Sequence, residues 1–272
     1  MNYFDQQLNL RARHPNFQEF IDFNHSESQR VREHYHCHLN IAYGRDPLQT
    51  LDVFPSPTPD APILIFIHGG YWRALDKSSY SFVAEPFVRH HFSVFVINYR
   101  LIPQVDLSEL VQDIVTATQW IRTHAQMYQG NPNAITMSGH SAGGHLALMV
   151  YLLNPKLRAY IRAICSISGL FDLQPIQQSY LNDTLQLDDA TVAAYSPVHQ
   201  DLEVVQCPLL LSVGLGETPL FIEQSLHLYQ QNKQNQLVKY LGIKDLNHYQ
   251  MIHELGQEAS PLTRFILQEG KV

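Results

Sequence analysis

The chain of 272 residues is poor in cysteine and in charge, and it has no long apolar run. Its three cysteines, Cys37, Cys165 and Cys207, form no Cys-x-x-Cys pair, which argues against a disulfide framework and favours a reducing compartment. Charged residues make up 16%, the formal net charge is −7, and no dense basic cluster occurs, so no nucleic-acid partner is expected. Residues 1–20 lack the apolar centre of a secretory signal, and no run approaches the roughly 20 apolar residues that cross a bilayer. We therefore expect a soluble, cytoplasmic protein without a membrane partner.

What the chain does have is enough apolar sequence for one large core. Hydrophobic residues make up 45%, and the length suits a single α/β domain over residues 1–272. Strand candidates alternate with helical patterns such as residues 106–124, and one of them, 63–67, is a continuous apolar run typical of a strand buried on both faces. The strand candidates lie at 63–67, 93–98, 134–137, 161–168, 208–213 and 238–241. This alternation predicts a mostly parallel central sheet with right-handed crossovers and helices on both faces.

Four segments stand outside this alternation. Residues 1–34 are expected to form a helical arm, whose aromatic residues either pack on the domain or cover a site. Residues 36–41 and 48–54 favour two antiparallel edge strands joined by a turn. The pattern weakens over residues 169–201, where prolines interrupt it, and we expect a lid or pocket insertion there.

A cluster of His34, His36, Cys37 and His38 raises the question of a metal site. On a strand, alternation sends His36 and His38 to one face and Cys37 to the other, and no second ligand group occurs at metal spacing. We expect no metal.

The most informative motif is Gly139-His140-Ser141-Ala142-Gly143-Gly144, which lies between a strand candidate and an apolar helix candidate. Glycines two before and two after Ser141 remove side chains that would clash in a sharp strand-to-helix turn. Such a turn exposes the hydroxyl and places it at a helix N-terminus, where negative charge is favoured. Ser141 is therefore the candidate nucleophile.

A second motif, His68-Gly69-Gly70-Tyr71-Trp72, follows the apolar run 63–67 directly. Acyl transfer develops negative charge on a carbonyl oxygen, and catalysis needs donors already aimed at that position. Glycines let backbone amides approach without steric hindrance. The amides of Gly69, Gly70 and Ala142 are the candidate oxyanion hole.

Together the two motifs resemble those of the α/β-hydrolase superfamily, in its hormone-sensitive-lipase-like and arylformamidase (kynurenine formamidase) branch. The His-Gly-Gly-x-Trp form points most closely to the formamidase side. Shorter similarities at 42–44, 49–54, 98–101 and 221–225 extend the likeness over most of the chain. The resemblance implies an α/β-hydrolase fold with a small lid or cap, and a serine hydrolase.

A nucleophilic serine needs a base, and the base needs a carboxylate that holds its tautomer. In this fold the chain order is serine, acid, histidine. His248 comes just after the strand candidate 238–241 and just before a helix, so it is the candidate base. The rival is His253, which we expect inside that helix.

Glu217 is the candidate acid because it follows the strand candidate 208–213 and keeps the Gly-x-x-acid spacing from Gly214. The resembling families more often carry aspartate there. Glu217 could instead be an ordinary acidic residue that opens a helix over 218–232, where negative charge suits the N-terminus. Asp245 is the rival acid.

These parts predict a reaction without metal or organic cofactor. His248 removes the proton of Ser141, the serine attacks an acyl carbon, and water releases the acyl-enzyme. The resemblance implies an aryl formamide such as N-formylkynurenine as substrate. A carboxylesterase and then a thioesterase are alternatives, and a non-catalytic binding protein with a hydrolase fold is a distant one.

Residues near the motifs are candidates for the substrate pocket. Tyr71, Trp72 and His140 adjoin the catalytic turns, although the two aromatic residues could equally pack beneath them. Arg73 or Arg100 could bind a substrate carboxylate or be structural. The oligomeric state is left open, with a homodimer possible.

Overall fold

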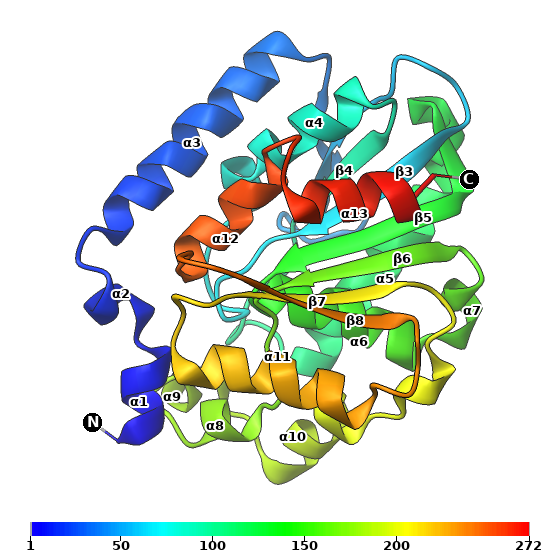
Figure 1. Ribbon diagram of the computed structural model, residues 1–272. Helices are drawn as coiled ribbons and strands as arrows, with labels where there is room; N and C mark the ends of the chain where they lie inside the picture. The colour runs from blue at the N-terminus through cyan, green and yellow to red at the C-terminus, as the bar shows by residue number, and fades with distance from the viewer. Residues whose placement is uncertain (1, 272) are drawn as a thin grey trace.

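The computed structural model describes residues 2–271 and contains one sheet in the order β1-β2-β4-β3-β5-β6-β7-β8 (Figure 1). The strands are β1 (His38–Ala42), β2 (Thr50–Phe54), β3 (Ala61–Ile67), β4 (Ser93–Ile97), β5 (Gly130–His140), β6 (Ile161–Ile167), β7 (Leu209–Gly214) and β8 (Val238–Ile243). At one edge of the sheet β2 pairs antiparallel with both β1 and β4. The remaining neighbours, from β4 through β3, β5, β6 and β7 to β8, pair parallel. The predicted α/β-hydrolase sheet is confirmed.

Helices cover both faces of the sheet (Figure 1). Those of the core layers are α3 (Phe17–His34), α4 (Ala84–Arg89), α5 (Leu107–His124), α6 (Ala142–Leu153), α11 (Pro219–Gln231), α12 (His248–Leu255) and α13 (Pro261–Glu269). The shorter helices are α1 (Tyr3–Leu8), α2 (Leu10–Arg13), α7 (Pro155–Arg158), α8 (Gln174–Gln177), α9 (Asn182–Leu185) and α10 (Asp189–Tyr195). Single 3₁₀ turns are η1 (Lys77–Ser79), η2 (Ser81–Val83), η3 (Ala125–Tyr128), η4 (Pro197–His199) and η5 (Leu202–Val204).

The alternation of side chains along β3 divides the core into two layers. Ile63, Ile65 and Ile67 pack with residues of α5, α6 and α11 on one face. Leu64 and Phe66 pack with residues of α3, α4, α12 and α13 on the other. Because both faces of β3 are covered, its residues 63–67 are all buried, which is why this stretch is apolar at every position.

Several helix boundaries follow from capping. Asp106 accepts from Glu109 N and begins α5, and Asn247 begins α12 in the same way, each with a reciprocal capping box. His248 is therefore the first residue of a helix and not, as its surroundings in the sequence predicted, a loop residue before one. β5 also begins earlier than the predicted run 134–137, because residues 130–133 extend it beside Ala61.

Two of the four segments outside the alternation, residues 1–34 and 169–201, contact each other through the beginning of the arm. α1, α2 and α3 make up the arm, and α8, α9 and α10 occupy the stretch 169–201 (Figure 1). Asn2 Nδ2 donates to Gln178 O at 2.7 Å, and Asp5 Oδ1 accepts from Tyr180 N at 2.7 Å. The arm is thus fastened to the α8–α9 region by polar contacts.

Within residues 2–271 no helix is long and apolar enough to cross a membrane. Cys37, Cys165 and Cys207 are free thiols. In the same part of the chain no three His, Cys, Asp or Glu side chains gather as a metal site.

Candidate active site

Ser141 lies on the sharp turn that joins β5 to α6. Its backbone has φ 57° and ψ −120°, a conformation that L-residues rarely adopt. A Cβ atom on Gly139 would lie 2.2 Å from Gly143 O, and one on Gly143 would lie 2.0 Å from Ile67 O. Both glycines are therefore required for the turn, and the strained serine is held by its N–H, which donates to Ile167 O at 2.8 Å.

Glu217 and His248 form a buried pair. His248 Nδ1 lies 2.6 Å from Glu217 Oε2, and the side chains are 5% and 0% exposed. The second carboxylate oxygen accepts from Gly214 N at 2.8 Å and from Ser168 Oγ at 2.5 Å. Because a carboxylate only accepts, we infer that Nδ1 carries the proton, which leaves Nε2 of His248 free to accept one.

The rival residues lie elsewhere. Asp245 is exposed and adopts φ 61° in the loop before α12. His253 bonds through Nε2 to Asn24 Oδ1 of α3 at 2.8 Å, and its ring packs 4.3 Å from that of Phe23. Burial lowers the pKa of His253 to about 4. The structure thus brings Glu217, and not Asp245, to His248, and it places His253 in the contact with the arm.

The turn after β3 lies beside the serine. A Cβ on Gly69 would meet His140 O at 2.9 Å and Ser141 Cβ at 3.1 Å, so the chain approaches the nucleophile closely here. Gly70 has φ +112°, and a Cβ there would lie 2.1 Å from Ala74 O. Among the residues that the structure describes, the amides of Gly69, Gly70 and Ala142 have no hydrogen-bond acceptor. Unpaired amides beside a serine hydroxyl are what an oxyanion hole requires.

His68, the residue before Gly69, anchors the turn after β3 in the core. Its ring is fully buried and lies between the rings of Tyr99 and Tyr80, with centroids 4.3 and 5.9 Å away. Nε2 lies 3.0 Å from Asn98 Oδ1, and the Tyr99 hydroxyl donates to His68 O at 2.8 Å. The backbone that carries Gly69 and Gly70 is therefore anchored by buried polar contacts.

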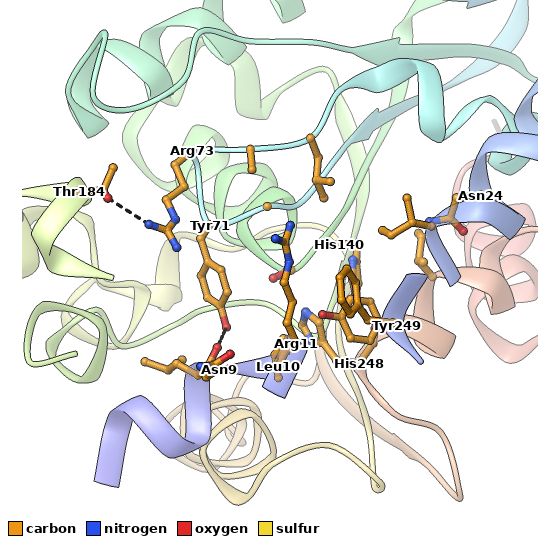
Figure 2. Close-up of a pocket in the computed structure, with 18 of the residues that line it drawn as sticks. Asn9, Leu10, Arg11, Asn24, Tyr71, Arg73, His140, Thr184, His248 and Tyr249 are labelled. Atoms are coloured by element: carbon orange, nitrogen blue, oxygen red, sulfur yellow. Dashed lines mark hydrogen bonds between the residues drawn. The ribbon is translucent and has the colours of Figure 1, made fainter. Parts of the chain in front are cut away.

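Of the three expected pocket residues, two line the cavity. Tyr71 lines it and donates through its hydroxyl to Leu8 O at 3.0 Å (Figure 2). His140 also lines it, and its Nε2 donates to His248 O at 3.0 Å. Burial, followed by the charge of His248, holds the pKa of His140 well below its usual value. His140 is therefore a neutral donor that fixes the backbone of His248.

Trp72, the third candidate pocket residue, packs in the core and not in the pocket. Its indole is completely buried in the core, its ring stands edge-on to His145 with centroids 5.0 Å apart, and it does not line the cavity. Tyr71 and Trp72 both have positive φ, of 50° and 57°. This tight backbone turn sends the two consecutive aromatic side chains to opposite environments.

The cavity has a volume of about 590 Å³ and contains Ser141, His140 and His248 in its wall. The arm supplies a large part of the lining, and Figure 2 shows Asn9, Leu10 and Arg11 reaching it from α2 and the residue before it. The residues that the arm contributes are Leu8, Asn9, Leu10, Arg11, Phe17, Ile21 and Asn24. Its aromatic residues divide, because Phe17 lines the cavity whereas Phe23 packs on Phe82 and His253.

The two candidate arginines separate clearly. Arg73 lines the cavity, and its Nη1 donates to Thr184 Oγ1 at 3.0 Å. Arg100 forms a salt bridge with the buried Asp113 at 2.7 Å and does not line the cavity, so its role is structural.

Sequence reasoning missed several residues of the site. Ser168 bonds the acid from the end of β6, and Arg11, Tyr180 and Tyr249 line the cavity. No local motif marks any of them, because each reaches the site only through the packing of distant segments. The nearest signal was the expectation that the arm could cover a site.

Comparison with known proteins places this geometry in a family. The BD-FAE family model matches residues 51–231, more than half of the chain. The chain is 29% identical over 257 residues to kynurenine formamidase of Danio rerio, covering 89% of this chain and 85% of the relative. A kynurenine formamidase of Drosophila melanogaster is 29% identical over 84% of this chain and 79% of its own. Esterase LipC of Mycobacterium tuberculosis is 33% identical over 53% of this chain and 39% of its own.

Solved structures agree in fold. A proposed thioesterase of Silicibacter sp. TM1040 superposes with a TM-score of 0.87 at 27% identity and covers 97% of this chain and 98% of its own. Esterase B of Lactobacillus rhamnosus superposes with a TM-score of 0.74 at 20% identity over 95% of this chain and 92% of its own. At that lower identity the likeness concerns the fold alone.

Proposed function

Because this chain belongs to the BD-FAE family and is a serine hydrolase of the arylformamidase-like branch, we propose that it removes the formyl group from an aryl formamide such as N-formylkynurenine. One observation carries the proposal: Ser141 and His248 line a single cavity beside unpaired amides, and the buried Glu217 holds His248 from behind. Relatives named kynurenine formamidase match over most of the chain, which favours a formamide over other acyl groups.

In the proposed mechanism His248 Nε2 takes the proton of Ser141 as the serine oxygen attacks the formyl carbon. The amides of Gly69, Gly70 and Ala142 donate to the oxyanion that forms. Glu217 holds the imidazole in the tautomer with Nδ1 protonated and stabilises the imidazolium. Glu217 and His248 are already held by buried hydrogen bonds, so the base is oriented before the substrate binds.

The imidazolium then gives its proton to the leaving nitrogen, which is needed because an aryl amide anion is a poor leaving group. The C–N bond breaks, and the aryl amine leaves a formyl ester on Ser141. Water, deprotonated by His248, attacks that ester and releases formate. The serine recovers its proton from His248.

An esterase is the second candidate, because Esterase LipC matches 53% of this chain at 33% identity and the same groups would cleave an ester. A phenolate or alkoxide leaves more readily than an amine nitrogen. The two functions therefore differ in how much they depend on proton delivery to the leaving atom. A thioester is the third candidate.

The deciding experiment compares steady-state kcat/KM on N-formylkynurenine, a short-chain p-nitrophenyl ester and a short-chain acyl thioester. The same measurements are made on wild type, on Ser141→Ala and on Ser26→Ala. Ser26→Ala is the matched control because Ser26 is an exposed serine of the arm. We expect the formamide to have the highest kcat/KM. Loss of that activity by at least about 10³-fold is expected in Ser141→Ala only.

Ester turnover with negligible formamide hydrolysis would move the assignment to the esterase. Equal rates for wild type and Ser141→Ala would remove the serine from the mechanism.

We also propose that the enzyme works in the cytoplasm. The three thiols stay free, and burial raises the pKa of Cys165 to about 12 and that of Cys207 to about 11, which keeps them protonated. Cell fractionation with detection of the tagged full chain tests this, and recovery in the secreted fraction would contradict it.

A further inference from the structure

The cavity that contains Ser141 carries positive charge without a matching negative charge. Arg11 and Arg73 both line it, and within residues 2–271 no aspartate or glutamate does. Glu217 lies behind His248 with its side chain fully buried, already bonded by three donors. Because the protein as a whole carries a formal charge of −7, this local excess of positive charge does not reflect overall composition.

Arg73 is held in place but not neutralised. It follows the oxyanion turn directly, its Nη1 donates to the hydroxyl of Thr184 at 3.0 Å, and its guanidinium lies 5.9 Å from the Tyr180 ring centroid. Among the described residues no carboxylate forms a salt bridge with it. A half-buried arginine with a neutral partner retains donors for an anion.

Arg11 reaches the cavity from the opposite wall, on α2 of the arm. In Figure 2 its side chain extends into the space between Tyr71 and the group formed by His140, His248 and Tyr249. Its positive charge opposes the rise that burial causes in the pKa of both Tyr249 and Tyr180, so the guanidinium lies within electrostatic range of both rings. It has no acidic partner in residues 2–271 either.

The position of Arg11 is fixed although its side chain is exposed. Leu10, the residue before it, is buried, and Asn9 Oδ1 accepts from Ala12 N at 3.2 Å to begin α2. Leu8 O accepts from Tyr71 OH at 3.0 Å and ties this part of the arm to the residue after Gly70. The Phe17 ring lies 5.1 Å from the guanidinium carbon. The arm therefore presents Arg11 to the same cavity that the catalytic turns face.

We infer that Arg11 and Arg73 form an anion subsite that selects substrates with a carboxylate on the aryl leaving group. Guanidinium groups match carboxylates by paired N–H donors, and the aromatic walls formed by Tyr71, Tyr180 and Tyr249 suit a ring between the carboxylate and the scissile bond. This inference rests on the proposed function, since it names the substrate class for the same site. It makes the arm part of the specificity determinant.

A binding measurement tests the subsite without turnover. Ser141→Ala protein is titrated by calorimetry with 3-phenylpropanoate and with the neutral isostere 3-phenylpropanamide. We expect the acid to bind at least about tenfold more tightly than the amide. This preference should fall at least about fivefold when Arg11→Gln or Arg73→Gln is added. Equal affinity for acid and amide in the parent protein overturns the inference.

The matched control is Arg13→Gln, because Arg13 lies on the same helix, is exposed and does not line the cavity. The acid preference should persist in this variant. If Arg13→Gln reduces it as much as Arg11→Gln does, the effect is long-range charge and the subsite is wrong. A fall confined to the Arg73 variant overturns the role of Arg11, and a fall confined to the Arg11 variant overturns that of Arg73. Thermal unfolding of each variant shows that it is folded.

Turnover separates this inference from the proposed function. Wild-type kcat/KM is measured on formanilide and 3-(2-formamidophenyl)propanoate, and on phenyl acetate and 3-(2-acetoxyphenyl)propanoate. A carboxylate preference in both pairs that falls in Arg11→Gln and returns in part in Arg11→Lys supports the subsite. A preference in the acetate pair with no hydrolysis of either formamide means that the formamidase proposal fails and the subsite stands. No preference in either pair overturns the subsite, whatever the acyl group.

Discussion

The hydroxyl of Ser168 donates to Oε1 of Glu217 at 2.5 Å, on the opposite side of the carboxylate from His248. Ser168 directly follows β6 and has φ 50°, and its own N–H donates to Ser212 O at 2.7 Å. This backbone bond to β7 fixes the residue that carries the hydroxyl. The carboxylate of Glu217 is fixed by side chain and backbone together, which compensates for a glutamate being longer and more flexible than an aspartate.

Replacing Ser168 by alanine should therefore lower kcat and leave KM nearly unchanged. Loss of a charge-assisted hydrogen bond lets the carboxylate turn and loosens the imidazole, and we expect a decrease in kcat of about tenfold. Steady-state kinetics on the preferred substrate measures it. Ser212→Ala is the matched control, since that buried hydroxyl donates to Ser166 O at 3.2 Å and does not touch the acid. Equal loss in both variants would mean that Ser168 acts only through folding.

The identity of the acid gives a second prediction. Glu217→Gln should lower kcat by about 10³-fold, because an amide stabilises neither the required tautomer nor the imidazolium. Asp245→Asn, an exposed residue of the loop before α12, should change kcat less than about twofold. Both are measured as initial rates at saturating substrate. A larger effect of Asp245→Asn would reverse the assignment of the acid.

Local sequence carries the parts of the site whose backbone is special. Gly139, Gly143 and Gly70 are needed because a Cβ at any of them would lie within 2.3 Å of a backbone oxygen, and such requirements leave a readable motif. The strands before Glu217 and His248 are recognisable in the sequence as the strand candidates 208–213 and 238–241. The sheet, its parallel order and its two covered faces follow from the strand candidates, and the structure confirms them.

Residues that meet only through packing leave no such signal. Ser168 and Glu217 are 49 residues apart, and Tyr71 and Leu8 are 63 apart. Arg11 carries no mark that distinguishes it from Arg13, because a helix of four residues has no clear periodicity. Trp72 shows the converse: its neighbourhood in the sequence pointed to the pocket, and the positive φ of two successive residues turned it into the core. Side-chain direction after a tight turn is decided by tertiary fit.

The oxyanion turn should not tolerate a methyl group. In Gly69→Ala the new Cβ would lie 2.9 Å from His140 O and 3.1 Å from Ser141 Cβ. The turn must therefore shift, and its amides no longer point at the position of the oxyanion. We expect kcat/KM to fall about 10²-fold. Gly256→Ala at the end of α12 is the control, since its methyl would meet the Phe82 ring at 3.0 Å and His253 O at 3.4 Å, away from the catalytic turns. Activity within about threefold of wild type for Gly69→Ala would remove Gly69 from the oxyanion hole.

His145 makes stability depend on pH in a defined direction. Burial lowers its pKa from 6.5 to about 4, while its Nε2 donates to Tyr195 O at 2.7 Å. Below pH 6.5 the unfolded chain takes up a proton that the folded protein refuses until about pH 4, so the free energy of unfolding falls as the pH falls through this window. Between pH of about 7.5 and about 5 the loss from this one group is on the order of 2 kcal/mol.

His145→Gln should remove that contribution, because the amide can still donate to Tyr195 O and does not titrate. The variant is less stable at neutral pH, since the contact with Trp72 is altered, but its free energy of unfolding should fall less on acidification than that of wild type. Urea unfolding at pH of about 7.5 and about 5 measures the free energy of unfolding of each protein at both values. The contributions of titrating groups that the two proteins share cancel when the two pH-dependent losses are compared. The exposed His199→Gln should follow wild type. Parallel losses in wild type and His145→Gln would show that His145 is not held neutral by the fold.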